Sequence, residues 1–191
     1  MKRIVVVDYD PAWPEDFEQV RSRVWPAIAD VAIAVEHVGS TSVPGLAAKP
    51  IVDISVVVPG QADVPAVIER LATVGYKHCG NLGVEGREAF AAPSALPLHH
   101  LYACPSDSLA LANHLAVRNY LRAHPEAARE YGELKKRLAQ RFLYDIDGYT
   151  DGKTDAILKM LRVAGFQQDS LETIERINRR PPNLRAAGPV L

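Results

Sequence analysis

The sequence predicts an α/β (α+β) fold, in which a mixed sheet with flanking helices is followed by a C-terminal helical region. Strand-like apolar runs alternate with helical patterns up to about residue 105, whereas helical spacing alone dominates afterwards. A hydrophobic content of 48% over 191 residues suits the packed core of one domain. We expect an α/β core at 1–105, a helical region packed on it at 106–180 and a loosely ordered tail at 181–191.

The charge balance and the cysteines narrow the classes of partner. The formal net charge is −1, which gives no overall field to attract nucleic acid or an anionic membrane. No run approaches the roughly 20 apolar residues of a membrane span, and the apolar run near the start is too short for a signal peptide. Cys79 and Cys104 fit neither a disulfide framework nor a metal-ligand spacing. We therefore expect a cytoplasmic protein whose partner is a small molecule, and the oligomeric state stays open.

Strand-like runs can be placed in order along the first part of the chain. Short apolar runs bounded by Gly, Pro or Asp predict strands. The strands are expected at residues 4–7, 31–38, 51–58, 76–79, 87–92 and 98–104. Between them, apolar residues at three- and four-residue steps predict one helix after Pro14 and another at 64–74, ended by Gly75.

Helical spacing takes over after Pro105. Ser106 or Ser108 can cap a helix that reaches about residue 123, where the next proline ends it. That proline, Pro125, suits the first turn of a second helix. Thr150 is expected to cap a third helix, and a last helix is expected at 170–178. The first three helices are expected to end near residues 123, 142 and 164.

The polar loop between the strands at 31–38 and 51–58 is the most informative stretch. Gly39 and Ser40 let backbone N–H groups approach an anion closely. Asp53 lies inside the apolar strand that follows, where a carboxylate is costly to bury unless a cation or donor meets it. If the two strands are neighbours, phosphates could lie on the loop while Asp53 binds Mg²⁺ or Mn²⁺. A tight turn with a hydrogen-bonded structural aspartate is the alternative.

His100 is the second candidate for the same site. It shares one face of its strand with Tyr102 because side chains alternate along a strand. If that strand lies beside the strand of Asp53, His100 could bind the metal or act as an acid or base near neutral pH. A core histidine bonded to a backbone carbonyl is the alternative. His99 points to the opposite face and is the weaker candidate.

Several basic residues are candidates to neutralise phosphate. Lys49 is held extended by the following proline, and Arg87 suits bidentate contacts. His114, Arg118 and Arg122 recur at four-residue steps, so they share a helix face that is either solvated or turned toward the ligand. The basic run at 135–137 is interpreted as exposed. The expected phosphate-binding set is Gly39, Ser40, Thr41, Ser42, Lys49, Arg87, Arg118 and Lys153.

Lys153 lies in a segment that looks like a phosphate-binding P-loop. Residues 148–154 have three positions between the glycines where that motif needs four, and no apolar strand precedes them. The better interpretation is a helix capped by Thr150, with Lys153 in its first turn. From there Lys153 can still point into a cleft.

The loop and the strand after it resemble the glycine-serine motif and following aspartate of nucleotidyltransferases of the DNA polymerase beta type. Those enzymes carry Asp-x-Asp, whereas this chain has Ser55 two residues after Asp53. Alternation puts both side chains on one face, so a serine stands where the second metal ligand would be. Two-metal phosphoryl transfer needs several carboxylates. The departure argues against full polymerase-type chemistry.

Along most of its length the chain resembles the GrpB family, small bacterial proteins of nucleotidyltransferase-like fold whose module is also found fused to dephospho-coenzyme A kinases. The stretch at 37–50 is the most specific match, and His100-Leu101-Tyr102 departs from an expected His-Leu-His. The other matching motifs are Tyr9-Asp10-Pro11-x-Trp13, Arg87-x-x-Phe90, Arg118-x-Tyr120-Leu121-Arg122 and Tyr149-Thr150-x-x-Lys153. The resemblance implies a nucleotidyltransferase-like sheet and a role near nucleotide or coenzyme A chemistry.

Two functions follow from these observations. The first is binding of a nucleotide or other phosphorylated ligand with transfer of a nucleotidyl or phosphoryl group, in which Asp53 and His100 act as catalytic and metal-binding residues with Mg²⁺ or Mn²⁺. The second is a non-catalytic nucleotide-binding or coenzyme A-related accessory module that has lost the second metal carboxylate. Ser55 is the residue that favours the second.

Overall fold

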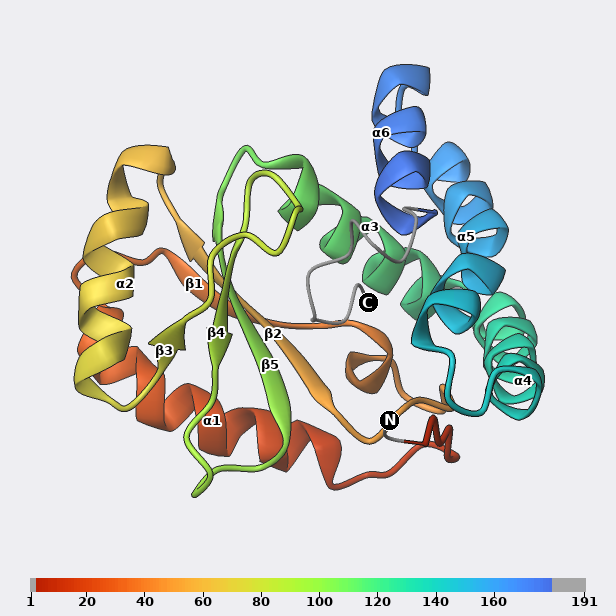
Figure 1. Cartoon of the computed structure of the whole chain (residues 1–191), viewed down its shortest axis with the longest axis horizontal. Helices are drawn as coiled ribbons and strands as arrows, with labels where there is room; N and C mark the ends of the chain where they lie inside the picture. The colour runs from red at the N-terminus through yellow and green to blue at the C-terminus, as the bar shows by residue number, and fades with distance from the viewer. Residues whose placement is uncertain (1–2, 180–191) are drawn as a thin grey trace.

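The strands expected between residues 31 and 104 form one five-stranded mixed sheet, in the order β1–β2–β5–β4–β3 (Figure 1). This is a computed structural model, and the residues that it describes are 3–179. The strands are β1 Ala34–Val38, β2 Val52–Val58, β3 Lys77–His78, β4 Glu88–Ala91 and β5 His99–Pro105. The helices are α1 Trp13–Ile28, α2 Val64–Thr73, α3 Leu109–Ala123, α4 Pro125–Arg141, α5 Ile146–Val163 and α6 Gln168–Asn178, with short 3₁₀ helices η1 Ser40–Ser42 and η2 Gln61–Asp63.

The pairing of β2 decides where the candidate site lies. β2 runs antiparallel to β1 and parallel to β5. In the parallel ladder Asp53 is the register partner of His100, and Ser55 is the partner of Tyr102. The predicted site required the strands at 31–38 and 98–104 to be neighbours of the strand that carries Asp53. Both conditions are confirmed.

The two faces of the sheet have different roles. Even-numbered β2 residues such as Ile54 and Val56 pack in a core with the apolar sides of α1 and α2. That face is closed by fully buried side chains such as Val20, Val24 and Leu71, which stabilise by roughly 1.5–3 kcal/mol each. The opposite face carries Asp53, Ser55 and the alternate residues of β5 toward α3. The functional candidates therefore face the helical region and not the main core.

The helices α3 to α6 gather at one end of the sheet, at the right of Figure 1. A second core joins them, with contributions from Leu121 of α3, Tyr131 of α4, Leu161 of α5 and Ile174 of α6. Val43, in the loop after η1, belongs to the same core. The helical region is thus anchored on the polar loop. Of the helices that the structure describes, none combines the length and the apolar character needed to span a membrane.

Most predicted elements are confirmed, with shorter strands, and two are corrected. Residues 4–7 do not form a strand, because Val7 pairs only with Ala48 as an isolated bridge. The third late helix starts at Ile146 and not at Thr150, because Asp145 caps it by accepting a hydrogen bond from the Gly148 N–H at 2.9 Å. The predicted division near residue 105 falls in the turn between β5 and α3. The tail expected at 181–191 lies outside the described residues.

Candidate functional site

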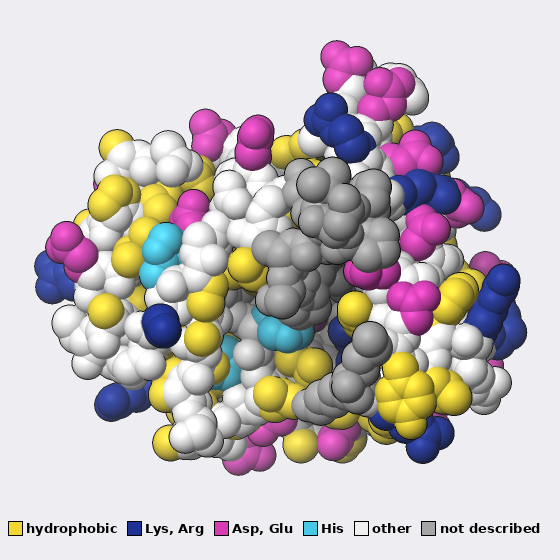
Figure 2. Space-filling model, viewed as in Figure 1, with side chains coloured by type: hydrophobic (Ala, Val, Ile, Leu, Met, Phe, Trp, Pro, Cys, Tyr) yellow, Lys and Arg dark blue, Asp and Glu magenta, His cyan; other side chains and the backbone are white. Residues whose placement is uncertain are grey.

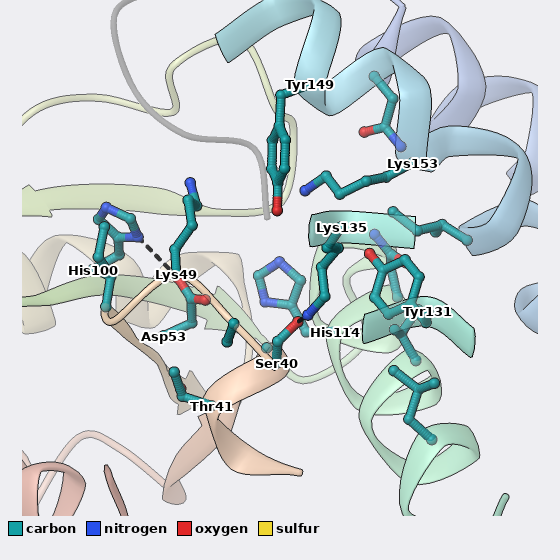
Figure 3. A pocket seen from close by; sticks show the side chains of 18 residues that line it. Ser40, Thr41, Lys49, Asp53, His100, His114, Tyr131, Lys135, Tyr149 and Lys153 are labelled. Atoms are coloured by element: carbon teal, nitrogen blue, oxygen red, sulfur yellow. Dashed lines mark hydrogen bonds and ion pairs between the residues drawn. The ribbon is translucent and has the colours of Figure 1, made fainter. Parts of the chain in front are cut away.

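A pocket lies where η1 and the first residues of β2 and β5 meet α3, α4 and α5 (Figure 3). Its cavity volume is about 60 Å³. Its principal polar and aromatic residues are Ser40, Thr41, Lys49, Asp53, His100, His114, Tyr131, Lys135, Tyr149 and Lys153. On the face of the molecule seen in Figure 2, acidic and basic side chains are interspersed. This face therefore offers no patch of one sign of charge, and the charges that could attract a ligand lie inside the pocket.

Asp53 and His100 form a hydrogen-bonded pair at the floor of the pocket. His100 Nδ1 lies 2.9 Å from Asp53 Oδ1, and the two side chains are 23% and 16% exposed. Burial would raise the pKa of Asp53, but the hydrogen bond from His100 and nearby positive charges outweigh it and lower the pKa below its usual range. Asp53 is thus an ionised acceptor, so the His100 Nδ1–H donates to it.

The loop formed by Gly39 and η1 lies directly against Asp53. Gly39 has φ +68°, and a Cβ at this position would come within 2.4 Å of Asp53 Oδ2, so both the backbone conformation and the space require glycine. Ser42 Oγ donates to the Gly39 carbonyl at 2.6 Å. Arg122 donates from Nε and Nη2 to the Ser42 carbonyl at 3.0 and 2.7 Å. Side chains on its far side thus hold the loop against the carboxylate.

Three lysines from three separate segments converge on this pocket. Lys49 precedes β2, Lys135 comes from α4 and Lys153 from α5. Lys135 Nζ donates to Ser40 Oγ at 2.7 Å and lies 4.8 Å from the ring centre of Tyr131. Lys153 and Lys49 place Nζ at 4.7 and 5.8 Å from the ring centre of Tyr149. Lys135 and Lys153 are each only 2% exposed, and Figure 3 shows both extending into the pocket.

Burial lowers the pKa of all three ammonium groups, and repulsion from neighbouring lysines adds to the shift for Lys135 and Lys153. Burial, followed by repulsion from Lys49, lowers the pKa of Lys153 to about 7. Burial and repulsion from Lys153 hold the pKa of Lys135 well below its usual range, and burial also lowers that of Lys49. Asp53 opposes these shifts and is the one carboxylate among the described residues that line the pocket. The electrostatics therefore favour an anion.

Ser55 and His114 make a buried pair that the sequence did not predict. Ser55 Oγ lies 3.1 Å from His114 Nδ1, and the two residues are 0% and 3% exposed. Burial, with repulsion from Arg87, lowers the pKa of His114 to about 4, so this imidazole is neutral at neutral pH. The position of the missing second carboxylate is thus occupied by a serine engaged with a neutral histidine.

Three residues of the predicted phosphate-binding set do not line the pocket. Arg118 Nη1 donates to Glu36 Oε2 at 2.6 Å and to the His37 carbonyl at 3.0 Å, because the neighbouring Val117 occupies the pocket side of α3. Arg87 lines an adjacent cavity. Ser42 turns back to the Gly39 carbonyl. The pocket brings together the other members of the set, Gly39, Ser40, Thr41, Lys49 and Lys153, with Asp53 and His100.

The interpretation of Lys135 as an exposed residue is wrong. Its helix buries Ala128, Tyr131 and Leu138, and a residue four positions after Tyr131 and three before Leu138 shares that face. Lys136, the next residue, is the solvated one and pairs with Asp8 at 2.7 Å. The apolar spacing around Lys135 was the signal that would have identified it.

The described residues do not by themselves fit a resident metal ion. Within residues 3–179, no group of three or more His, Cys, Asp and Glu side chains is placed to hold one. Asp53 and His100 offer at most two ligands, and they are hydrogen-bonded to each other. Mg²⁺ demands near-octahedral coordination, mostly by oxygen. A divalent ion would therefore need further oxygens from a ligand and from water.

Comparison with known proteins places the chain in context. The family model described as GrpB protein matches residues 3–162. The chain is 35% identical to a UPF0157 protein of Bacillus subtilis over 156 residues and 37% identical to one of Pseudomonas aeruginosa over 166. These matches cover 82% and 83% of the chain but only 46% and 66% of the two relatives. The crystal structure of conserved protein GrpB from Enterococcus faecalis is 36% identical, with a TM-score of 0.73 over 88% of this chain and 98% of that one.

Two more distant likenesses are to a uridylyl transferase structure and to a kinase sequence. Terminal uridylyl transferase 4 from Trypanosoma brucei with bound dUTP has a TM-score of 0.54 at 14% identity, over 92% of this chain and 62% of that one. At this identity the likeness shows a nucleotidyltransferase-like fold. A dephospho-CoA kinase of Mycolicibacterium paratuberculosis is 26% identical over 169 residues, which cover 75% of this chain and 42% of the kinase.

Proposed function

The chain belongs to the GrpB family, and from this premise we propose that its pocket binds a nucleotide or another phosphorylated ligand. One observation carries the proposal: Lys49, Lys135 and Lys153 line one pocket with the loop at Ser40, and Asp53 is the single carboxylate among its described lining residues. The structural relative from Trypanosoma brucei has dUTP bound, which supports a nucleotide as the ligand class.

Buried ammonium groups favour phosphate for a physical reason. Burying a charge costs several kcal/mol unless a counter-charge and hydrogen bonds compensate it. Phosphate oxygens supply both, because each accepts charge-assisted hydrogen bonds from Lys135 and Lys153. The Ser40 hydroxyl and the backbone amides of the loop add neutral donors. A bound phosphate would thus restore the charged state that burial disfavours in these lysines.

Transfer of a nucleotidyl or phosphoryl group is the enzymatic form of this proposal. The lysines would stabilise the charge on the transferred group, which is how such transfers are mainly promoted. Asp53 and His100 would act on the incoming nucleophile, with the Asp53 carboxylate orienting His100 as a proton acceptor. Mg²⁺ or Mn²⁺ would enter with the nucleotide, because the described residues do not make a metal centre alone.

A non-catalytic binding module is the second candidate. Ser55 supports it, because its hydroxyl is engaged by the neutral His114 and does not replace a metal-binding carboxylate. A dephospho-CoA kinase among the relatives suits an accessory role near coenzyme A chemistry. For both candidates we propose a cytoplasmic location, which suits the unpaired thiols Cys79 and Cys104.

Titration calorimetry tests the proposal. ATP, GTP, CTP and coenzyme A are titrated into the protein with Mg²⁺, with Mn²⁺ and with EDTA. Lys135→Met should weaken binding at least about tenfold, because one charge-assisted contact is lost, whereas Lys136→Met, a matched change of the solvated neighbour, should leave the affinity unchanged. No binding by the wild type to any of these ligands would refute the proposal.

The same titrations separate the enzyme from the module. Metal dependence that disappears in Asp53→Asn would support the enzymatic form. Equal affinity with and without metal, unchanged in Asp53→Asn, would favour the module.

A further inference from the structure

A second cavity adjoins the phosphate pocket and is used by neither proposal above. It lies between the loop before β4, the first residues of α3 and one side of α6, and its cavity volume is about 550 Å³. Asn113, His114 and Asn178 line both cavities. A ligand group in the second cavity would therefore lie next to a ligand in the first.

Arg87, which lines this second cavity, is buried and has no ionic partner within residues 3–179. The residue is 2% exposed, and among the residues that the structure describes its Nε and Nη2 atoms have no hydrogen-bond partner. Its guanidinium carbon lies 4.3 Å from the ring centre of Tyr102, a cation–π contact that does not use the in-plane N–H donors of Nε and Nη2. Buried guanidinium groups are ordinarily paired with an anion. The arrangement leaves two buried guanidinium nitrogens able to donate to an anion.

The start of α3 adds a second, independent source of positive potential. Ser108, Leu109 and Ala110 line the cavity, and they form the N-terminus of a 15-residue helix. Ser108 Oγ satisfies the Leu111 N–H at 3.2 Å. The other amides of a first helical turn point outward and favour negative charge. An anion beside Arg87 would meet both the guanidinium and this helix end.

A glycine brings the two features together. Gly86 precedes Arg87 and has φ +72°, and a Cβ at this position would come within 2.8 Å of Ser108 Cβ. The loop before β4 can thus approach the start of α3 closely (Figure 1). Among the described residues the cavity is also lined by Arg176 and one carboxylate, Glu85, so these charged side chains are net positive with Arg87.

We propose that this cavity is a second anion subsite, in which Arg87 and the start of α3 bind a phosphate or carboxylate group. The wall that it shares with the lysine pocket carries another buried atom without a partner, Asn113 Oδ1, which can accept a hydrogen bond from the same ligand. The subsite goes beyond the proposed function, because it assigns a second anionic group to the ligand or to a co-substrate. The chemical class that fits is a molecule with two anionic groups, or a nucleotide with an anionic acceptor.

Calorimetric titration with inorganic phosphate, and in parallel with acetate, tests the subsite. Wild type should bind two phosphates per chain, Arg87→Met one, and Arg21→Met, the same change on the outer side of α1, two. Lys135→Met should leave only the phosphate at Arg87. A heat from acetate that Arg87→Met removes would identify a carboxylate site, and its absence a phosphate site.

The outcomes separate this proposal from the lysine pocket. One phosphate in wild type that is lost in Lys135→Met and kept in Arg87→Met would overturn the subsite and leave the lysine pocket standing. One phosphate in wild type that is lost only in Arg87→Met would support the subsite and overturn phosphate binding in the lysine pocket. If Arg87→Met does not fold, the ¹⁵N–¹H signal of Arg87 Nε in wild type, assigned by its loss in Arg87→Lys, replaces it. A signal that does not move at saturating phosphate would overturn the proposal.

Discussion

Binding of a nucleotide should weaken as the pH rises, because the ligand must recharge a lysine that burial has partly neutralised. The pKa of Lys153 is about 7 without a ligand, so about half of the molecules carry this charge at pH 7 and about one in a hundred at pH 9. A bound phosphate holds Lys153 protonated. The affinity should therefore fall about 50-fold between pH 7 and pH 9, which is roughly 2.3 kcal/mol.

The direction and the magnitude of this change in affinity follow from the titratable groups that face the site. Lys135 and Lys49 also have lowered pKa values, so they can only add to the proton uptake. Asp53 stays ionised and His114 stays neutral across this range. A phosphate monoester, whose second pKa is about 6, is fully ionised above pH 7.5. The lysines are thus the groups in the site whose titration explains a loss of affinity above that pH.

Calorimetry in buffers of different ionisation enthalpy measures this directly. At pH 8 the binding of one ATP should take up about 0.9 proton, the deprotonated fraction of a group with a pKa of 7, or more if Lys135 contributes. Lys153→Met should lower the uptake by that amount. An affinity that is constant from pH 7.5 to 9, or a release of protons on binding, would refute the assignment of a buried, partly neutral lysine to the ligand site.

Three further substitutions test the construction of the site. Gly39→Ala should cost about 1–3 kcal/mol in urea unfolding, since the φ of +68° and the contact with Asp53 both oppose a Cβ; an unchanged midpoint would contradict the close packing. Ser55→Ala should cost about 1 kcal/mol by removing the partner of His114 while leaving nucleotide affinity unchanged, and a large loss of affinity would assign Ser55 to the ligand. Lys135→Met should raise the melting temperature of the unliganded protein, because methionine fills a similar volume without a buried amine; a lower melting temperature would show that this amine is compensated without a ligand.

Local patterns predicted the parts of the site that depend on one segment. Alternation along the strand placed Asp53 and Ser55 on one face, and the glycine-serine loop indicated where an anion would lie. The pairing of Asp53 with His100 depended on two strands 47 residues apart in sequence. It could be stated only as a condition, because periodicity does not reveal which strands are neighbours.

The helical half of the site was harder to predict. Lys135 contacts Ser40 across 95 positions of sequence, and its place in a basic run concealed the apolar spacing of its helix. Arg118 stands one position away from Val117, and successive helix residues point about 100° apart. A shared face therefore could not distinguish the pocket side from the side that contacts β1. Thr150 failed as a cap because Asp145 offered an earlier and equally suitable one.

A crystal structure of the protein soaked with ATP tests the central claim most directly, because it locates the phosphates. The account predicts phosphate oxygens at about 2.7–2.9 Å from Nζ of Lys135 and Lys153, with the loop at Ser40 beside them. Phosphates bound instead on outward residues such as Lys136, or a lysine pocket without density at saturating ATP, would contradict it.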